Sequence, residues 1–159
     1  MSEINIIVAC GTNRVIGREG RLPWKIQADW DYFLNTTQNG ILIMGRKCFE
    51  DFLPYAKSRE VIALSRDPTV DFPHAKKASS LKQALEITRN SGKTTWICGG
   101  EKIYQEAMPL ADHLYLTAID AAFDGDVHFP PWEKFFTREL SRKSVICGSH
   151  KLELLILGK

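Results

Sequence analysis

An acid surrounded by aromatic residues is the first feature of the sequence that suggests chemistry. In LPWKIQADWDYF (residues 22–33), a helical period places Ile26, Trp30 and Phe33 on one face, and Asp29 lies within that face. A buried carboxylate resists ionisation unless something hydrogen-bonds it, so a functional role would explain its position. The alternative is a solvated acid in the first helical turn, where a negative charge complements the helix dipole. The apolar neighbours on both sides of Asp29 favour the functional interpretation.

Cations and a hydroxyl follow two of the apolar runs that we predict to be strands. Gly45 follows the run ILIM, and Arg46 and Lys47 then open a predicted helix. Ser65 and Arg66 follow the run VIAL. Free backbone N–H groups at a helix start, a guanidinium and a hydroxyl together suit a phosphate group. Each stretch alone is also typical of a solvated basic turn.

A pair of glycines follows a third apolar run. In TTWICGGEKIY (residues 94–104), Gly99 and Gly100 lead directly into a predicted helix. Adjacent glycines let the backbone approach a ligand closely, although a tight strand-to-helix turn would use them equally well. The G-x-G-x-x-G pattern is absent, so an ordinary dinucleotide-binding Rossmann fold is not supported. The long loop NRVIGREGRLPW (residues 13–24) is typical either of a lid beside a site or of a plain connection.

Short apolar runs separated by helical patterns predict the elements that position these residues. Five runs are typical of buried strands: Ile4–Cys10, Ile41–Met44, Val61–Leu64, Thr94–Cys98 and His113–Ile119. Ser80 and Gln83 form the capping-box pattern of a helix that ends near Gly92, and Pro109 stops another helix. Buried strands that alternate with helices predict a largely parallel sheet covered on both faces.

The last third of the chain has a different pattern. The segments Phe135–Ile146 and Lys151–Leu157 flank the turn-like stretch CGSH, which predicts an antiparallel hairpin at one edge of the sheet. The fold class is therefore a three-layer α/β/α domain with a mixed, mostly parallel sheet. Ligands bind such sheets beyond the carboxyl ends of the strands, where the basic residues and the glycine pair fall.

Composition excludes several other classes. The 159 residues suit one domain, and a hydrophobic content of 44% with 25% charged residues is that of an ordinary globular protein. A net charge of +2 is too weak to argue for a nucleic-acid or membrane surface. The four cysteines form no C-x-x-C pair and the four histidines have no metal-ligand spacing. Without a leader-like start or a membrane-length apolar run, we expect a cytoplasmic protein with reduced cysteines and no metal.

Seven motifs, taken in order, resemble dihydrofolate reductase of the bacterial type over the whole chain. They are IIVACGTNRVIG, LPWKIQAD, IMGRKCFE, VIALSRD, ICGGEKIY, LYLTAID and DGDVHFP. The resemblance implies one domain over residues 1–159, with an eight-stranded mixed sheet, four helices and a C-terminal antiparallel hairpin. It also implies hydride transfer from NADPH to C6 of 7,8-dihydrofolate, with water-assisted protonation of N5. The tetrahydrofolate product would feed one-carbon metabolism and thymidylate, purine and amino-acid synthesis. Dihydrofolate and antifolates would be the small-molecule partners of a monomer.

The resemblance implies a role for each residue of a substrate site. Asp29 would accept hydrogen bonds from the pterin N3 and 2-amino group, and Thr117 would join Asp29 to the pterin through a water. Arg59 would bind the α-carboxylate of the glutamate tail. Leu22 would lie in a loop that closes over the nicotinamide, so Asp29, Leu22 and Thr117 would be the catalytic set. The pocket walls implied by the resemblance are Ile7, Val8, Trp30, Phe33, Phe52 and Cys98.

A cofactor site is implied in the same way. Arg46, Lys47 and Lys102 would contact phosphates, while Ser65 and Arg66 would bind the 2′-phosphate that distinguishes NADPH from NADH. The pair Gly99-Gly100 would form a cis peptide bond beside the cofactor. The full implied set is Ala9, Ile16, Gly17, Leu22, Gly45, Arg46, Lys47, Cys48, Ser65, Arg66, Cys98, Gly99, Gly100, Glu101, Lys102, Ile103 and Tyr104.

Five positions depart from the usual pattern of the family. Cys48 stands where threonine is common, Cys98 where isoleucine or valine is common, Trp30 and Ala56 where leucine is usual, and Gln27 where proline is usual. These changes concern antifolate binding more than the reaction. A rival reductase of the same fold, acting on a riboflavin-pathway pyrimidine, lacks the pairing of Asp29 with Arg59. A nucleotide-binding module without catalysis would favour alanine or asparagine at position 29, and a thiol redox protein would need a resolving cysteine.

Overall fold

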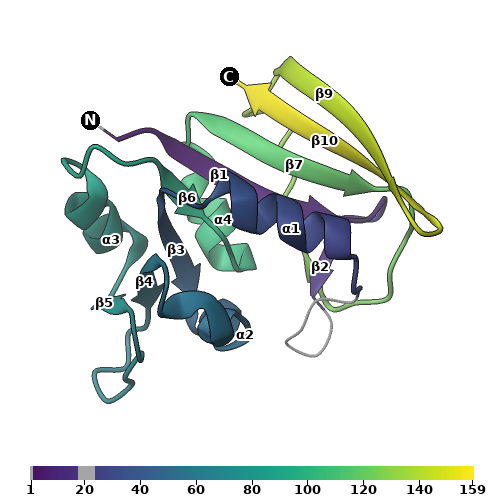
Figure 1. Ribbon diagram of the computed structural model, residues 1–159. Helices are drawn as coiled ribbons and strands as arrows, with labels where there is room; N and C mark the ends of the chain where they lie inside the picture. The colour runs from purple at the N-terminus through teal and green to yellow at the C-terminus, as the bar shows by residue number, and fades with distance from the viewer. Residues whose placement is uncertain (1, 18–23) are drawn as a thin grey trace.

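The computed structural model describes residues 2–17 and 24–159. Within these residues an eight-stranded sheet has the strand order β5-β4-β3-β6-β1-β7-β10-β9 (Figure 1). Its strands in chain order are β1 (Ile4–Cys10), β3 (Ile41–Gly45), β4 (Glu60–Leu64), β5 (Lys76–Ala78), β6 (Thr95–Ile97), β7 (His113–Ile119), β9 (Arg138–Cys147) and β10 (His150–Gly158). The strands from β5 to β7 are parallel, and β10 pairs antiparallel with both β7 and β9. The predicted mixed sheet and its C-terminal hairpin are confirmed.

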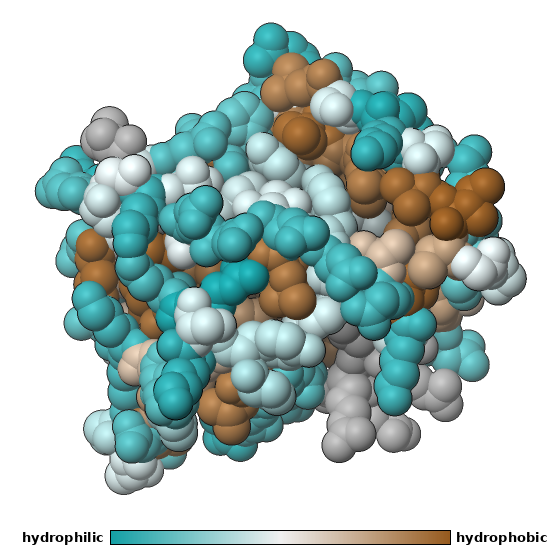
Figure 2. Space-filling model, viewed as in Figure 1, coloured by the Kyte–Doolittle hydropathy of each residue, from teal (hydrophilic) through white to brown (hydrophobic). Residues whose placement is uncertain are grey.

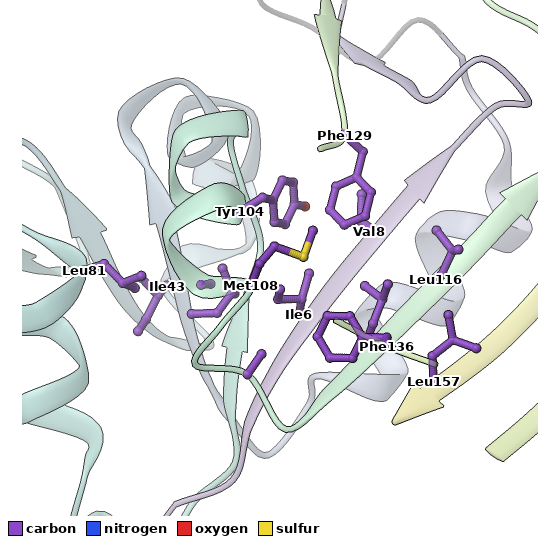
Figure 3. Packing of buried hydrophobic residues seen from close by; sticks show 14 of the residues in the cluster. Ile6, Val8, Ile43, Leu81, Tyr104, Met108, Leu116, Phe129, Phe136 and Leu157 are labelled. Atoms are coloured by element: carbon purple, nitrogen blue, oxygen red, sulfur yellow. The ribbon is translucent and has the colours of Figure 1, made fainter. Parts of the chain in front are cut away.

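Two pairs of helices cover opposite faces of the sheet. The described residues contain four helices: α1 (Gln27–Thr36), α2 (Arg46–Ala56), α3 (Leu81–Thr88) and α4 (Glu101–Ala107). One buried cluster joins α3 and α4 to β1, and Figure 3 shows Tyr104 and Met108 facing Ile6 and Val8. A second cluster joins α1 and α2 to the other face, where Ile7 packs among their aromatic side chains. The predicted three-layer α/β/α architecture is confirmed.

Local signals in the sequence fix two of the helix ends. The Ser80 hydroxyl accepts a hydrogen bond from the backbone N–H of Gln83 at 3.1 Å, which satisfies one free donor at the start of α3. The side chain of Gln83 accepts from the backbone N–H of Ser79 at 2.7 Å, so the reciprocal bond of the capping box falls one residue earlier than usual. Helix α4 begins directly after Gly100, as the glycine pair predicted.

A small second sheet, which the sequence did not predict, holds the chain near the end of β1. Strand β2 (Val15–Gly17) pairs antiparallel with β8 (Val127–His128). A Cβ atom on Gly125 would lie 2.4 Å from the carbonyl oxygen of Gly17, so this pairing requires glycine at position 125. None of the helices in the described ranges is long and apolar enough to cross a membrane. Hydrophobic residues gather on the surface along the β9–β10 hairpin (Figure 2), where Ile146 is 78% exposed.

Candidate functional site

The Asp29 carboxylate lies in the first turn of α1, half-buried against the sheet. Among the described residues its one hydrogen-bond donor is the indole Nε1 of Trp24, 3.2 Å from Oδ2. Burial raises the pKa of Asp29, and the bond from Trp24 partly offsets that rise. A carboxylate can accept about four hydrogen bonds, so the described residues leave most of its acceptor capacity to a ligand with several donors.

An aromatic wall extends from Asp29 along α1 and across to α2. The ring of Trp30 stacks on Phe33 with centroids 5.3 Å apart, and Phe33 meets Phe52 edge to face at 6.0 Å. Although this face packs on the buried cluster, no residue of α1 is fully buried. The wall therefore keeps accessible aromatic surface of the kind on which a flat heterocycle or benzoyl group packs.

Tyr55 belongs to this wall but was missed by the sequence reasoning. Its ring centroid lies 5.2 Å from that of Trp30 and 5.7 Å from that of Phe52. The signal was present, because Tyr55 follows Phe52 by three residues on α2 and so shares its helix face. The same helix carries Ala56, which is fully buried.

Arg59 lies at the far end of the wall, between α2 and β4, and is fixed to the end of α1. Its Nη2 donates to the carbonyl oxygen of Leu34 at 2.7 Å, and its Nη1 donates to the hydroxyl of Thr37 at 3.1 Å. Partial burial lowers the pKa of the guanidinium, which stays charged because arginine does not deprotonate in proteins. The structure thus holds a cation and the Asp29 carboxylate on the same side of the sheet, at opposite ends of one helix.

Three neighbouring strands form the floor beneath the wall. Ile7 of β1 packs in the α1–α2 cluster together with Cys98, which directly follows β6. Thr117 of β7 pairs in register with Ala9 and is 2% exposed, without a direct hydrogen bond to Asp29 among the described residues. The water link implied for Thr117 stays a prediction.

The placement of Val8 bears on its predicted contact with the substrate. Its side chain packs in the cluster of α3 and α4, beside Phe129 and Tyr104, and not with Ile7 (Figure 3). Successive side chains of a strand point to opposite faces, so Ile7 and Val8 cannot both line one wall. A contact from Val8 to a ligand on the α1–α2 side would have to come from its backbone.

A second group of residues gathers at the carboxyl ends of β3 and β6. The peptide bond Gly99-Gly100 is cis, as predicted, and the carbonyl of Gly99 accepts a hydrogen bond from the N–H of Gly45 at 2.9 Å. Gly99 has φ +124°, a conformation that a residue with a side chain rarely adopts. A Cβ on Gly45 would approach Ile103 to 3.1 Å. Glycine at both positions lets this stretch of backbone approach a ligand closely.

Side-chain hydrogen bonds connect α2 and α4 to the backbone of β1 and to the residue that follows β6. The phenol of Tyr104 donates to the carbonyl of Ile7 at 2.9 Å, and the thiol of Cys48 donates to the carbonyl of Cys98 at 3.3 Å. Burial, with a smaller contribution from Asp51, raises the pKa of Cys48 to about 12. Burial also raises the pKa of Cys98 well above its usual value. Both cysteines are therefore neutral packing groups at physiological pH.

The predicted phosphate-binding residues lie along the same edge of the sheet. Because β4, β3 and β6 are adjacent and parallel, the residues that follow them span about 10 Å, which is two strand spacings. Arg46 and Lys47 open α2 and are exposed, and Ser65 and Arg66 follow β4. Hydrogen bonds from Thr69 are the main cause of the lowered pKa of Asp67, and the charges of Lys77 and Arg46 add to it.

The remaining predicted cofactor residues lie on three elements. Ala9 lies half-buried near the end of β1, and Ile16 and Gly17 lie in β2. In α4, Lys102 is exposed, and the Glu101 carboxylate accepts a hydrogen bond from the N–H of His128 at 3.4 Å. Leu22 falls outside the described residues. A groove of about 550 Å³ lies between α3, the start of β1 and the end of α4, and none of the predicted site residues in the described ranges lines it.

An open, mostly parallel sheet with glycines and cations at its carboxyl edge is typical of α/β proteins that bind a nucleotide. The family model for dihydrofolate reductase matches residues 3–151. The chain is 36% identical to the dihydrofolate reductase of Staphylococcus haemolyticus over 128 residues, which cover 80% of this chain and 76% of the relative. It is also 36% identical to dihydrofolate reductase type 3 of Salmonella typhimurium, over 89% of this chain and 86% of the relative.

A solved structure has the same architecture. Dihydrofolate reductase from Enterococcus faecalis, complexed with NADP(H) and RAB-propyl, superposes with a TM-score of 0.85 and 25% identity. The superposition covers 99% of this chain and 97% of that one. The chain belongs to the dihydrofolate reductase family, and it is an oxidoreductase.

Proposed function

We propose that this enzyme reduces 7,8-dihydrofolate to 5,6,7,8-tetrahydrofolate with NADPH as its cofactor. The observation that best supports this substrate is the placement of Asp29 and Arg59 at opposite ends of α1. Thr37, which holds Arg59, follows Asp29 by eight residues, so the two polar ends lie about 12 Å apart at 1.5 Å of rise per residue. An elongated ligand with donors at one end, an aromatic middle and a carboxylate at the other end fits this arrangement. Dihydrofolate has these three parts.

Asp29 has the role of an anion that binds and polarises the pterin. Its carboxylate accepts hydrogen bonds from the pterin N3–H and 2-amino group, and a water delivers the proton to N5. Charge-assisted hydrogen bonds of this kind are about twice as strong as neutral ones, and they compensate the cost of keeping the carboxylate ionised in a partly buried place. Trp24 orients the carboxylate, and Thr117 joins it to the pterin through a water. The aromatic wall and Ile7 exclude solvent around the ring.

The residues at the carboxyl edge fit a phosphorylated dinucleotide. Ser65 and Arg66 would bind the 2′-phosphate and thereby select NADPH over NADH, while Arg46, Lys47 and Lys102 would contact the other phosphates. NADPH supplies the hydride for C6 of the substrate. The backbone beside the glycine pair supports this fit. A side chain at position 45 would crowd Ile103, so glycine there lets the backbone come close to a bound cofactor.

The nicotinamide end would meet residues at the ends of β1, β2 and β6. Backbone groups of Ala9 and Ile16 would recognise the carboxamide, and Tyr104 and Cys98 would line its approach. Leu22 would belong to a loop that closes over the site. Placing NADPH here brings it beside the floor formed by Ile7 and Thr117, where the pterin would lie.

The wider setting follows from the same assignment. We infer one domain over residues 1–159 that acts as a monomer in the cytoplasm, without nucleic-acid or membrane partners, and feeds one-carbon metabolism. Antifolates would bind in the pterin pocket. Their affinities would reflect Trp30 and Tyr55, whose rings make contact where the benzoyl part of a ligand would pass.

The test is consumption of NADPH by the purified protein. We expect NADPH absorbance to fall when dihydrofolate is added and to stay constant when dihydrofolate or the protein is left out. Tetrahydrofolate should accumulate in a one-to-one ratio with the NADPH consumed. Constant absorbance across the whole range of pH in which the protein stays folded would refute the proposed function.

A further inference from the structure

Thr37 forms one of the two contacts that fix the guanidinium of Arg59. The Thr37 side chain is fully buried, and its hydroxyl lies 3.1 Å from Nη1 of Arg59 and 2.8 Å from the carbonyl oxygen of Phe33. A hydroxyl has one proton, which here goes to the Phe33 carbonyl. The lone pair of the oxygen therefore faces the guanidinium and can only accept.

The other contact of the guanidinium, to Leu34, would by itself leave the group free to rotate, and Thr37 prevents that rotation. The carbonyl of Leu34 accepts from Nη2 of Arg59, and a single hydrogen bond would let the planar guanidinium pivot about it. With Thr37 on the neighbouring nitrogen, the plane is fixed by two points on one helix end. The other N–H groups of the fork are then held in one orientation for a carboxylate.

From this geometry we propose that Thr37 is a positioning residue for substrate specificity, because it presents Arg59 to the carboxylate tail of the substrate. This inference rests on the proposed function and deepens it. Thr37 touches neither the reacting atoms nor the pterin end of the site, so it acts through Arg59 alone. Its effect should appear in binding of the tail and not in the chemical step.

Replacing Thr37 by valine isolates this contact. Valine keeps the branched shape of the buried side chain and replaces the hydroxyl with a methyl group. The carbonyl of Phe33 keeps a partner, because the backbone N–H of Thr37 also donates to it at 3.1 Å. The adjacent Thr36 offers a matched control, since its side chain hydrogen-bonds Tyr32 and not Arg59. Thr36→Val makes the same chemical change one residue away.

The experiment compares two substrates: dihydrofolate, and a dihydropterin that lacks the benzoylglutamate tail. For Thr37→Val we expect the KM for dihydrofolate to rise about tenfold, because a hydrogen bond to a charged group is lost. We expect kcat to stay unchanged. That rise corresponds to about 1.4 kcal/mol. We expect kcat/KM for the tail-less substrate to be unchanged, and Thr37→Ser, which restores the hydroxyl, to return the KM toward its original value. Thr36→Val should match the unchanged protein on both substrates.

A double-mutant cycle separates positioning from a general structural effect. On an Arg59→Ala background, Thr37→Val should add no further rise in KM. Equal losses on both substrates, no loss at all, or full additivity in the cycle would each overturn the inference. If Thr37→Val does not fold, Thr37→Ala removes the same oxygen and is judged by the same outcomes. Turnover by the unchanged protein without any Thr37 effect overturns only this inference, whereas absence of that turnover overturns the proposed function with it.

Discussion

Replacing Asp29 by asparagine should separate activity from stability, because the two change in opposite directions. The amide oxygen of asparagine can still accept the hydrogen bond that Trp24 donates at 3.2 Å, so the local fold should persist. The amide NH₂ is a donor, however, and would face the donors of the pterin where the carboxylate accepted them. The neutral amide also carries no charge to polarise the ring.

The expected loss follows from the hydrogen bonds that the carboxylate would make. Two bonds to a charged acceptor are worth about 1.5–3 kcal/mol each, or about 3–6 kcal/mol together. At about 1.4 kcal/mol per factor of ten, kcat/KM for dihydrofolate should fall by about 10²–10⁴ at neutral pH. Part of the activity should return in acid, where the solvent protonates N5 of the substrate before it binds.

The stability of the same variant should change with pH in a defined direction. Because burial raises the pKa of Asp29 above its value in the unfolded chain, the folded state holds this proton more tightly. The unchanged protein therefore loses the corresponding stability as pH rises through the raised pKa, whereas the variant has no group there to titrate. Asp29→Asn should be more stable at neutral pH, and this difference should vanish below the usual pKa of an aspartate.

Initial rates of NADPH consumption across pH, together with thermal unfolding of both proteins in the same buffers, measure these effects. A variant that keeps its neutral-pH activity would refute the role of Asp29 as the anion facing the pterin. A stability difference that is independent of pH would refute the link to ionisation.

Three further changes test other parts of the site. Arg59→Ala should raise the KM for dihydrofolate by about 10²-fold through loss of a charge-assisted pair, and comparable losses on a tail-less pterin would contradict the tail contact. Arg66→Ala should raise the KM for NADPH but not the KM for NADH in steady-state titrations, because NADH lacks the 2′-phosphate. An equal effect on both cofactors would exclude a contact between Arg66 and the 2′-phosphate. Phe52→Ala should lower the free energy of unfolding by about 3–5 kcal/mol in chemical denaturation, since this ring is 2% exposed, and a loss below about 1 kcal/mol would show that the wall is not part of the core.

The sequence predicted the long elements of the fold well because their signals are local. The apolar runs of β1 and β7 ended at the residues where the strands end, since both faces of these central strands are buried. The short strands β2, β5 and β8 went unpredicted. Each has two or three residues and forms only because a partner backbone lies beside it, which no local pattern reveals.

The site was predictable as residue types but not as contacts. Asp29 stood out because it interrupts an apolar face, while the bond from Trp24 depends on a turn whose geometry the sequence leaves open. The link between Thr37 and Arg59 joins residues 22 positions apart and depends on how α1 meets the end of α2. Val8 shows a related limit, because alternation separates it from Ile7 but does not say which face each will take.

The central claim is that hydride passes from NADPH to C6 of dihydrofolate in this site. The most direct test supplies NADPH that carries deuterium at the transferred position of C4, and locates the label in the product by NMR. We predict tetrahydrofolate with one deuterium at C6, formed in step with NADPH oxidation. Product that carries no deuterium at C6, or NADPH oxidation without tetrahydrofolate, would contradict the account.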